Sequence, residues 1–191
     1  QGCRHNPEFS LLEWYRCGWD EHQLMDEIAE LISLVFAARS SQPLAITKRT
    51  YGDCFSQILG IDPHGADLVE LQENAVAASS DSWTGESRAN CLDLLFSQLV
   101  EPQLPSGLVF VYDYPACQSA LAQLHNDTQG RQVSRRFEVF LNGLELANGY
   151  FELTDIAEQQ QRFDGDNAQR IEASKPQIPV DRHLLAALDH G

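Results

Sequence analysis

Basic residues are scarce in this chain of 191 residues, which carries 13 Lys and Arg against 28 Asp and Glu. The formal net charge is therefore −15 at pH 7, and the isoelectric point lies near 4.6. Binding to nucleic acid through broad phosphate neutralisation needs a basic face that releases counterions. The composition argues against such a surface, and most of the carboxylates are expected to be solvated.

Long hydrophobic runs and a recognisable cysteine pattern are also missing. No apolar stretch approaches the roughly 20 residues that span a bilayer, and the N-terminal QGCRHNPEF lacks the apolar core of a signal peptide. The five cysteines are odd in number and widely spaced, and they contain no C-x-x-C. This pattern fits neither a disulfide framework nor a zinc site. Together these absences predict a protein of the reducing cytoplasm with no membrane association.

The apolar residues that are present are enough for one folded domain, because 43% of the chain is hydrophobic and 21% is charged. Helical spacing and capping residues predict helices at about 20–38, 53–59, 66–78, 86–99, 155–172 and 181–189. Short apolar runs predict strands at about 9–15, 45–50, 108–112, 137–141 and 144–150. Because strands and helices do not alternate strictly, we expect an α+β fold with an antiparallel sheet flanked by helices. The continuous apolar run at 108–112 predicts a central strand.

The dipeptide Asn142-Gly143 predicts a two-residue hairpin turn, since both residues tolerate positive φ. In the regular register residue 140 lies opposite 145 and residue 138 opposite 147, which places Glu138 and Glu145 on one face. Two carboxylates so placed suit a magnesium ion that is held mostly by nucleotide phosphates. Two solvated strand glutamates are the alternative.

The end of the hairpin carries a second polar group, Asn148, Tyr150 and Glu152. In a regular strand these residues face away from Glu145, so a single site needs a bulge, for which Gly149 is a natural place. An amide and a carboxylate beside an aromatic ring suit a small cationic amine. A polar strand edge is the alternative.

The N-terminal segment Arg4-His5-Asn6-Pro7-Glu8-Phe9 combines two basic side chains, an amide and an aromatic ring. Arg and His side chains bind polyphosphate oxygens, and a Phe ring stacks on a base. The alternative is an ordinary polar turn.

RHNPEFSLLEWY and FEVFLNGLELANGYFELTDIAEQQQRF together resemble the exit of motif 2 and the following hairpin of the class II lysyl-tRNA synthetases. The resemblance covers nearly the whole chain and is weakest in 40–105. It implies one partial catalytic domain over 1–191. In that domain 1–38 would be the motif 2 exit strand and helix, 40–105 a mixed insert, and 107–191 the sheet hairpin and C-terminal helices.

The resemblance also implies ATP and magnesium as cofactors and lysine or beta-lysine as the substrate. The positions that match the family's site are Arg4, His5, Asn6 and Phe9 for ATP, Glu138 and Glu145 for magnesium, and Glu13, Tyr15, Asn148, Tyr150 and Glu152 for the amino acid. Arg4 and His5 would act catalytically at the phosphates, Phe9 would lie against adenine, and Glu152 would face the distal ammonium.

Within this family, Ala147 in ELANGY and the segment PACQSALAQ resemble the branch that attaches beta-lysine to elongation factor P. The Ala147 methyl group is expected to reshape the amino-acid pocket. The implied reaction is adenylate formation followed by transfer to a lysine of elongation factor P, catalysed by a homodimeric parent protein. The alternatives are a fragment of a true lysyl-tRNA synthetase, with tRNA-Lys as acceptor, and a non-catalytic binding module derived from the fold.

Two family motifs are expected outside the chain. Motif 1 and the first strand of motif 2 would precede Gln1, and motif 3 would follow Gly191. The chain is therefore expected to be an interior fragment that is inactive alone.

Overall fold

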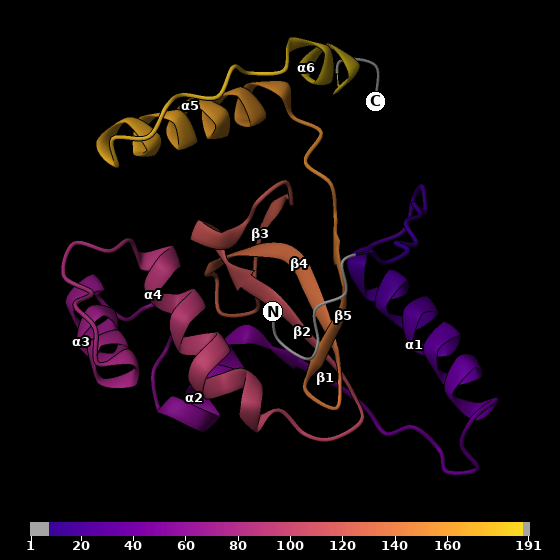
Figure 1. The fold of residues 1–191 in the computed structure, drawn as a ribbon. Helices are drawn as coiled ribbons and strands as arrows, with labels where there is room; N and C mark the ends of the chain where they lie inside the picture. Colours follow the sequence, from indigo (N-terminus) through magenta and orange to yellow (C-terminus); the bar gives the residue numbers. More distant parts are fainter. Residues whose placement is uncertain (1–7, 189–191) are drawn as a thin grey trace.

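The computed structural model describes residues 8–188. A five-stranded sheet lies at the centre, with α1 along one side, α2, α3 and α4 along the other, and α5 and α6 beyond the end of the sheet (Figure 1). The helices are α1 (Glu21–Ala37), α2 (Tyr51–Leu59), α3 (Leu68–Ser79), α4 (Arg88–Leu95), α5 (Ile156–Glu172) and α6 (Arg182–Leu188). The strands are β1 (Ile46–Thr50), β2 (Leu108–Pro115), β3 (Leu124–Asn126), β4 (Gln132–Leu141) and β5 (Leu144–Tyr150). These elements confirm the expected α+β class.

The sheet is mixed rather than purely antiparallel, which corrects the prediction. Its order is β1-β2-β4-β3, and β5 pairs with β4. β1 runs parallel to β2, while the β2–β4, β3–β4 and β4–β5 pairs are antiparallel. A parallel pair needs a long crossover, and α2, α3 and α4 supply it between β1 and β2. β2 is an interior strand, as its continuous apolar run predicted.

Two helices begin where their capping residues predicted. Asp20 accepts a hydrogen bond from the Gln23 amide, and the Gln23 side chain accepts one from the Asp20 amide, so the capping box before α1 is complete. At α5 the Asp155 side chain accepts a hydrogen bond from the Glu158 amide. These bonds satisfy N–H groups that have no partner inside the helix.

The sheet separates two hydrophobic clusters. On one face Met25, Ile28 and Ala29 of α1 pack on alternate residues of β2 and β4, such as Phe110 and Phe137. On the other face the α2–α4 helices pack on the intervening residues Val109, Val111 and Phe140. A strand that is covered on both faces must be apolar throughout, which explains the composition of β2.

The strand predicted over Phe9–Tyr15 does not form, because no described segment pairs with it. Strand geometry leaves backbone groups unsatisfied without a neighbouring strand. Phe9, Leu11, Leu12 and Tyr15 are largely exposed, at 76%, 79%, 74% and 67%. A short β3 that was not predicted occupies the edge of β4 instead.

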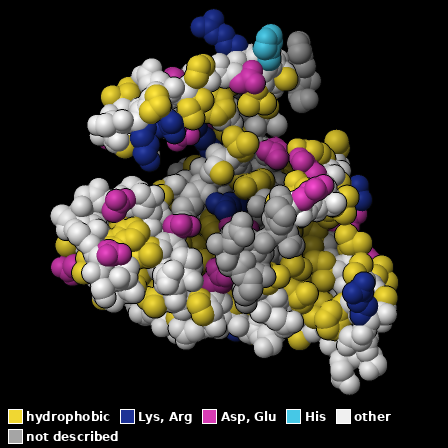
Figure 2. Space-filling view, in the orientation of Figure 1, with side chains coloured by type: hydrophobic (Ala, Val, Ile, Leu, Met, Phe, Trp, Pro, Cys, Tyr) yellow, Lys and Arg dark blue, Asp and Glu magenta, His cyan; other side chains and the backbone are white. Residues whose placement is uncertain are grey.

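Hydrophobic side chains also remain on the outer side of α1. Figure 2 shows apolar side chains gathered over this region, and Leu34 and Val35 are 65% and 61% exposed. Within residues 8–188 no helix combines the length and hydrophobicity needed to cross a bilayer.

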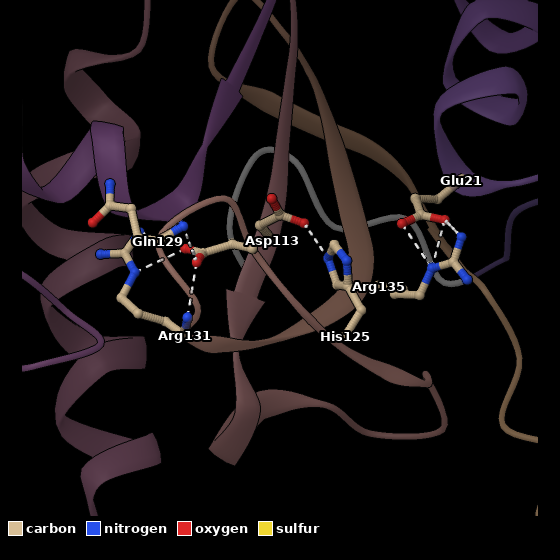
Figure 3. A network of polar contacts seen from close by, with 7 residues as sticks. Glu21, Asp113, His125, Gln129, Arg131 and Arg135 are labelled. Carbon is tan, nitrogen blue, oxygen red and sulfur yellow. Dashed lines mark hydrogen bonds and ion pairs between the residues drawn. The ribbon is translucent and has the colours of Figure 1, made fainter.

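A group of charged side chains orders the β3–β4 turn. Asp127 accepts hydrogen bonds from the amides of Gln129 and Arg131, at 2.8 and 2.9 Å, and from Arg131 Nε at 2.8 Å (Figure 3). His125 of β3 pairs with Asp113 of β2 at 3.0 Å. The turn therefore holds the start of β4 in place beside β2.

Candidate functional site

The β4–β5 hairpin places four of the predicted site residues on one face. Phe140 pairs with Glu145, and Glu138 pairs with Asn148. Directly opposed residues share a face, as do residues two apart on one strand. Glu138, Glu145, Asn148 and Tyr150 therefore lie on the same side of the sheet, and the prediction that Glu138 and Glu145 share a face is confirmed.

A β-bulge makes this arrangement possible. Val139 pairs with Ala147 and the next residue, Phe140, pairs with Glu145, so Leu146 has no partner on β4. The extra residue lets Glu145 and Asn148, which are three apart, point the same way. The predicted pairing of residue 138 with 147 is wrong by one residue, and the bulge lies at Leu146 rather than at Gly149.

Gly149 has a different role, since it faces the ring of Phe137 directly across the ladder. A Cβ atom at Gly149 would lie 2.3 Å from Phe137 Cζ and 2.6 Å from Cε1. Only a residue without a side chain leaves room for the ring at this position. The glycine therefore allows the ring to pack on β5 between two site residues, Asn148 and Tyr150.

Arg136 and its neighbours surround the Glu138 carboxylate. Arg136 Nη2 forms an ion pair with Glu138 Oε1, and Arg136 Nη1 donates to the Gln118 carbonyl at 3.1 Å. The guanidinium carbon lies 4.6 Å from the centre of the Tyr114 ring and 5.9 Å from that of Tyr150. The ion pair and the two aromatic faces fix the orientation of Arg136, and so also that of the Glu138 carboxylate.

Glu145 lies in the electrostatic field of this group. Partial burial raises the pKa of its carboxyl group above the ordinary value, the charge of Glu138 raises it further, and Arg136 opposes that shift. The register places the two carboxylates on one face of paired strands, which agrees with the direction of this shift.

These two carboxylates suit a hard cation only in part. Among residues 8–188 there is no group of three or more His, Cys, Asp or Glu side chains that is able to hold a metal ion. A magnesium ion keeps several waters and is commonly bound by one or two carboxylates together with substrate phosphates. The pair fits that mode of binding, in which the nucleotide supplies most of the ligands.

Glu13, Tyr15 and Glu152 form a second convergent group. Tyr15 Oη donates a hydrogen bond to Glu13 Oε1 at 2.8 Å. This bond and the charges of Glu13 and Glu152 raise the pKa of the Tyr15 hydroxyl. Partial burial and the Glu13 charge raise the pKa of Glu152. Two like charges held near each other favour a cation between them, and an ammonium group has the matching charge and donors.

Three predicted nucleotide contacts, Arg4, His5 and Asn6, lie outside the described residues. Phe9 lies inside them and exposes 76% of its surface. Its ring packs into neither core cluster. The structure therefore places the hairpin residues and the Glu13–Tyr15 residues, and the roles of all the predicted site residues stay predictions.

The expectation that the Ala147 methyl group reshapes the amino-acid pocket stays a prediction. Ala147 pairs with Val139 and packs with the cluster beneath α1, on the face opposite to Asn148 and Tyr150. The alternation of side chains along the strand turns its methyl group away from the site. Ala147 therefore lies in the same cluster as Trp14, the neighbour of Glu13 and Tyr15.

Arg136, Tyr114 and Gln118 are the site neighbours that sequence reasoning missed. Arg136 precedes Glu138 by two residues, so strand alternation alone places both on one face. Tyr114 and Gln118 come from a part of the chain about 20 residues earlier, and the β2–β4 pairing brings them close. The position of Arg136 was therefore predictable from the sequence. The positions of Tyr114 and Gln118 depended on the order of the strands in the sheet.

Residues 2–191 match the family described as tRNA synthetases class II (D, K and N). The chain is 46% identical over 195 residues to the elongation factor P (R)-beta-lysine ligase of Edwardsiella ictaluri. It is 44% identical over 193 residues to the proteins of the same name from Pseudoalteromonas translucida and Vibrio cholerae. Each alignment covers 100% of the chain and 57% of the relative, so the chain spans little more than half the length of these proteins.

Proposed function

The chain belongs to the class II tRNA synthetases of the D, K and N type, and on that premise we propose that it is part of the catalytic core of an ATP-dependent ligase for beta-lysine. The parent protein activates (R)-beta-lysine, or lysine, as an adenylate and transfers it to a lysine of elongation factor P. The observation that carries the proposal is the single face on which the bulged hairpin places Glu138, Glu145, Asn148 and Tyr150.

The proposed site has a nucleotide side and an amino-acid side. Glu138 and Glu145 would hold a magnesium ion, which would supply neutralisation of phosphate charge during adenylate formation. Arg136 keeps the Glu138 carboxylate oriented. Arg4, His5, Asn6 and Phe9 complete the nucleotide side, with Arg4 and His5 at the phosphates. The carboxylate of the substrate attacks the α-phosphorus, pyrophosphate leaves, and no enzyme nucleophile takes part.

The amino-acid side consists of Glu13, Tyr15, Asn148, Tyr150 and Glu152. Glu13 and Glu152 supply the negative charge that a dehydrated ammonium group needs. Asn148 and Tyr150 contribute an amide and an aromatic face on β5. Reaction requires that both substrates be held in contact with each other, which is supported by the shared face of Glu138, Glu145, Asn148 and Tyr150 on the β4–β5 hairpin.

The proposal extends to the whole protein. We infer a homodimeric, cytoplasmic parent protein, in which 1–191 forms part of a single catalytic domain. The net charge of −15 favours a protein acceptor over tRNA-Lys, because tRNA binding gains from basic surfaces. The proteins similar over the whole chain carry the name of an elongation factor P ligase, which supports the same acceptor.

The test uses the full-length protein that contains this chain. Pyrophosphate exchange is measured with (R)-beta-lysine and with lysine, followed by transfer of each to elongation factor P and to tRNA-Lys. We expect faster exchange with (R)-beta-lysine and transfer to elongation factor P alone.

Glu138→Gln should lower the exchange rate by about 100- to 1000-fold, the cost of losing one group that stabilises transition-state charge. Glu30→Gln, on the exposed side of α1, is the matched control. Transfer to tRNA-Lys would overturn the proposal.

A further inference from the structure

Arg135 occupies a junction of three segments. On the side away from β2, β4 pairs first with β3 and then with β5. Arg135 lies between these two pairings. Its amide donates to the Gln123 carbonyl at 2.9 Å, and its carbonyl accepts from the Phe151 amide at 2.8 Å. The Gln123 amide donates to the Phe151 carbonyl at 2.8 Å, which closes the triangle. The backbone at Arg135 therefore fixes the residues on either side of Phe151.

The side chain of Arg135 joins this junction to α1. Its guanidinium carbon lies 3.6 Å from the centre of the Phe151 ring. Its Nε and Nη2 atoms donate to both oxygens of Glu21, at 2.6 to 2.9 Å (Figure 3). The side chain of Glu21 is 3% exposed and that of Arg135 is 22% exposed. This pair is a charge-assisted fork between a buried carboxylate and a planar cation.

α1 also holds the segment that contains Glu13 and Tyr15. Trp14 Nε1 donates to Glu27 at 2.9 Å, and Arg16 Nε donates to the same carboxylate at 2.9 Å. Glu27 and Glu21 both belong to α1. A continuous path of contacts therefore leads from residues 14–16 through α1 to Arg135 and from there to Phe151.

This path joins the two halves of the proposed amine site. Glu13 and Tyr15 flank Trp14 in sequence, and Tyr150 and Glu152 flank Phe151. Glu13 and Glu152 carry like charges that repel when no cation lies between them. A site made of two such segments needs a rigid connection that does not pass through the site itself.

We propose that Glu21 and Arg135 are a positioning pair, which holds the Glu13–Tyr15 segment and the Tyr150–Glu152 segment in register to receive an ammonium group. The inference rests on the proposed function for the identity of the ligand, and its geometry stands without it. Neither Glu21 nor Arg135 touches the substrate. The pair acts through Phe151 on one side and through α1 on the other.

The test measures convergence of the two segments in the 191-residue chain without any ligand. Carboxyl ¹³C NMR follows the titration of Glu152 with and without Glu13→Gln. In the parent chain this substitution should lower the pKa of Glu152, since it removes a neighbouring negative charge. In the neutral pair Glu21→Gln/Arg135→Met the same substitution should leave the pKa of Glu152 unchanged, because the segments no longer lie together.

The matched control is Asp26→Asn/Lys48→Met. It removes another ion pair between α1 and the sheet, of 2.5 Å, at a distance in sequence from both segments. In the control chain Glu13→Gln should lower the pKa of Glu152 by as much as in the parent chain. The proposal is overturned if the Glu21→Gln/Arg135→Met chain is folded and also keeps that effect.

A second variant decides the matter if the double substitution does not fold. Glu21→Gln alone keeps the size of the side chain, and the partly exposed Arg135 can still reach water. It should reduce the effect of Glu13→Gln on Glu152 by at least about half, because a neutral amide holds the guanidinium less firmly than a carboxylate. An undiminished effect in this variant also overturns the proposal.

In the full-length ligase the pair has a separate kinetic signature. Glu21→Gln/Arg135→Met should raise KM for the amino acid by about 10- to 100-fold, the usual cost of a small misplacement in a reactive complex. KM for ATP should change less, since Glu138 and Glu145 lie on the β4–β5 hairpin, which the substitutions leave in place. A ligase that uses a different substrate would refute the proposed function and leave the titration result intact, so the two failures are distinguishable.

Discussion

Single residues decide how closely the strands of the site approach one another. Gly149→Ala should destabilise the fold, because the new Cβ atom would lie 2.3 Å from Phe137 Cζ within a packed cluster. We expect a loss of about 1 to 3 kcal/mol in the free energy of unfolding, as for other overpacked cores. Urea denaturation measures it. Gly165→Ala is the control, because a Cβ there meets nothing within 4 Å and alanine favours the helix. Equal stabilities of the two variants would contradict the prediction.

The charge on Glu145 should cost stability at neutral pH. Burial and Glu138 raise its folded-state pKa, so the folded chain prefers the protonated carboxyl, and the cost disappears as the pH falls through the raised pKa. Glu145→Gln should therefore stabilise the chain at pH 7.5 by about 0.5 kcal/mol, a modest value because the group is largely exposed. The gain should vanish at pH 4.

Denaturation of Glu145→Gln and the parent chain at both pH values provides the measurement. Glu30→Gln, on the solvent side of α1, should change little at either pH. A gain in stability that persists at pH 4 would show that relief of repulsion from Glu138 is not the cause.

The sequence predicts residue positions well where local rules apply. Asn142 and Gly143 have φ of +50° and +75°, as the hairpin turn required, and the carboxylates of Glu138 and Glu145 share a face. Ala147 shows where such reasoning fails. The regular register placed it opposite residue 138, and in the structure it pairs with Val139 and packs toward α1. The bulge at Leu146 shifts the pairing of the residues that follow it, and a single sequence carries no clear signal for a bulge.

At the scale of elements, the hairpin should tolerate removal of the residue that forms the bulge in β5. Deleting Leu146 should leave the pairs Phe140–Glu145 and Glu138–Asn148 in place, because Leu146 has no partner in the ladder. Its side chain is 45% exposed, so little packing is lost. We expect a change in stability of less than about 1 kcal/mol, as for surface changes that leave buried contacts intact. Cross-strand NOEs between the paired residues check the register, and Leu146→Ala controls for the side chain. Loss of the Glu138–Asn148 contact would refute the prediction.

Elements with a strong local pattern were predictable, and those that depend on distant partners were not. The helix after Asp20 and the helix after Asp155 begin at their capping residues. The segment Phe9–Tyr15 has the composition of a strand and forms none, because strand formation also requires a neighbour. The parallel β1–β2 pair was missed for a related reason, since sequence patterns do not encode strand order.

At the scale of the whole molecule, we expect the 191-residue chain alone to show little ATP–pyrophosphate exchange with lysine or beta-lysine. It spans 57% of the length of its relatives, and Phe9, the predicted adenine contact, is 76% exposed. Loss of even one preorganised group at a phosphoryl centre costs about 100- to 1000-fold in rate. The full-length ligase of Edwardsiella ictaluri is the reference in the same assay. Exchange by the chain within tenfold of that enzyme would contradict the prediction.

Because the molecule has two separate hydrophobic clusters, its helices and strands should open to solvent in a definite order. α1 contributes only Met25, Ile28 and Ala29 to the buried core, besides the buried carboxylate of Glu21, while β2 and β4 are covered on both faces. Weakly buried elements open at lower free energy than central strands, so the amides of α1 should exchange with solvent before those of β2. Glu13 and Tyr15 are anchored to α1 through Trp14 and Arg16 and would leave with it, while the β4–β5 hairpin keeps Glu138 and Glu145 in place. Thermal fluctuation would therefore carry Glu13 and Tyr15 away from the hairpin first and leave Glu138, Glu145, Asn148 and Tyr150 together on their strands.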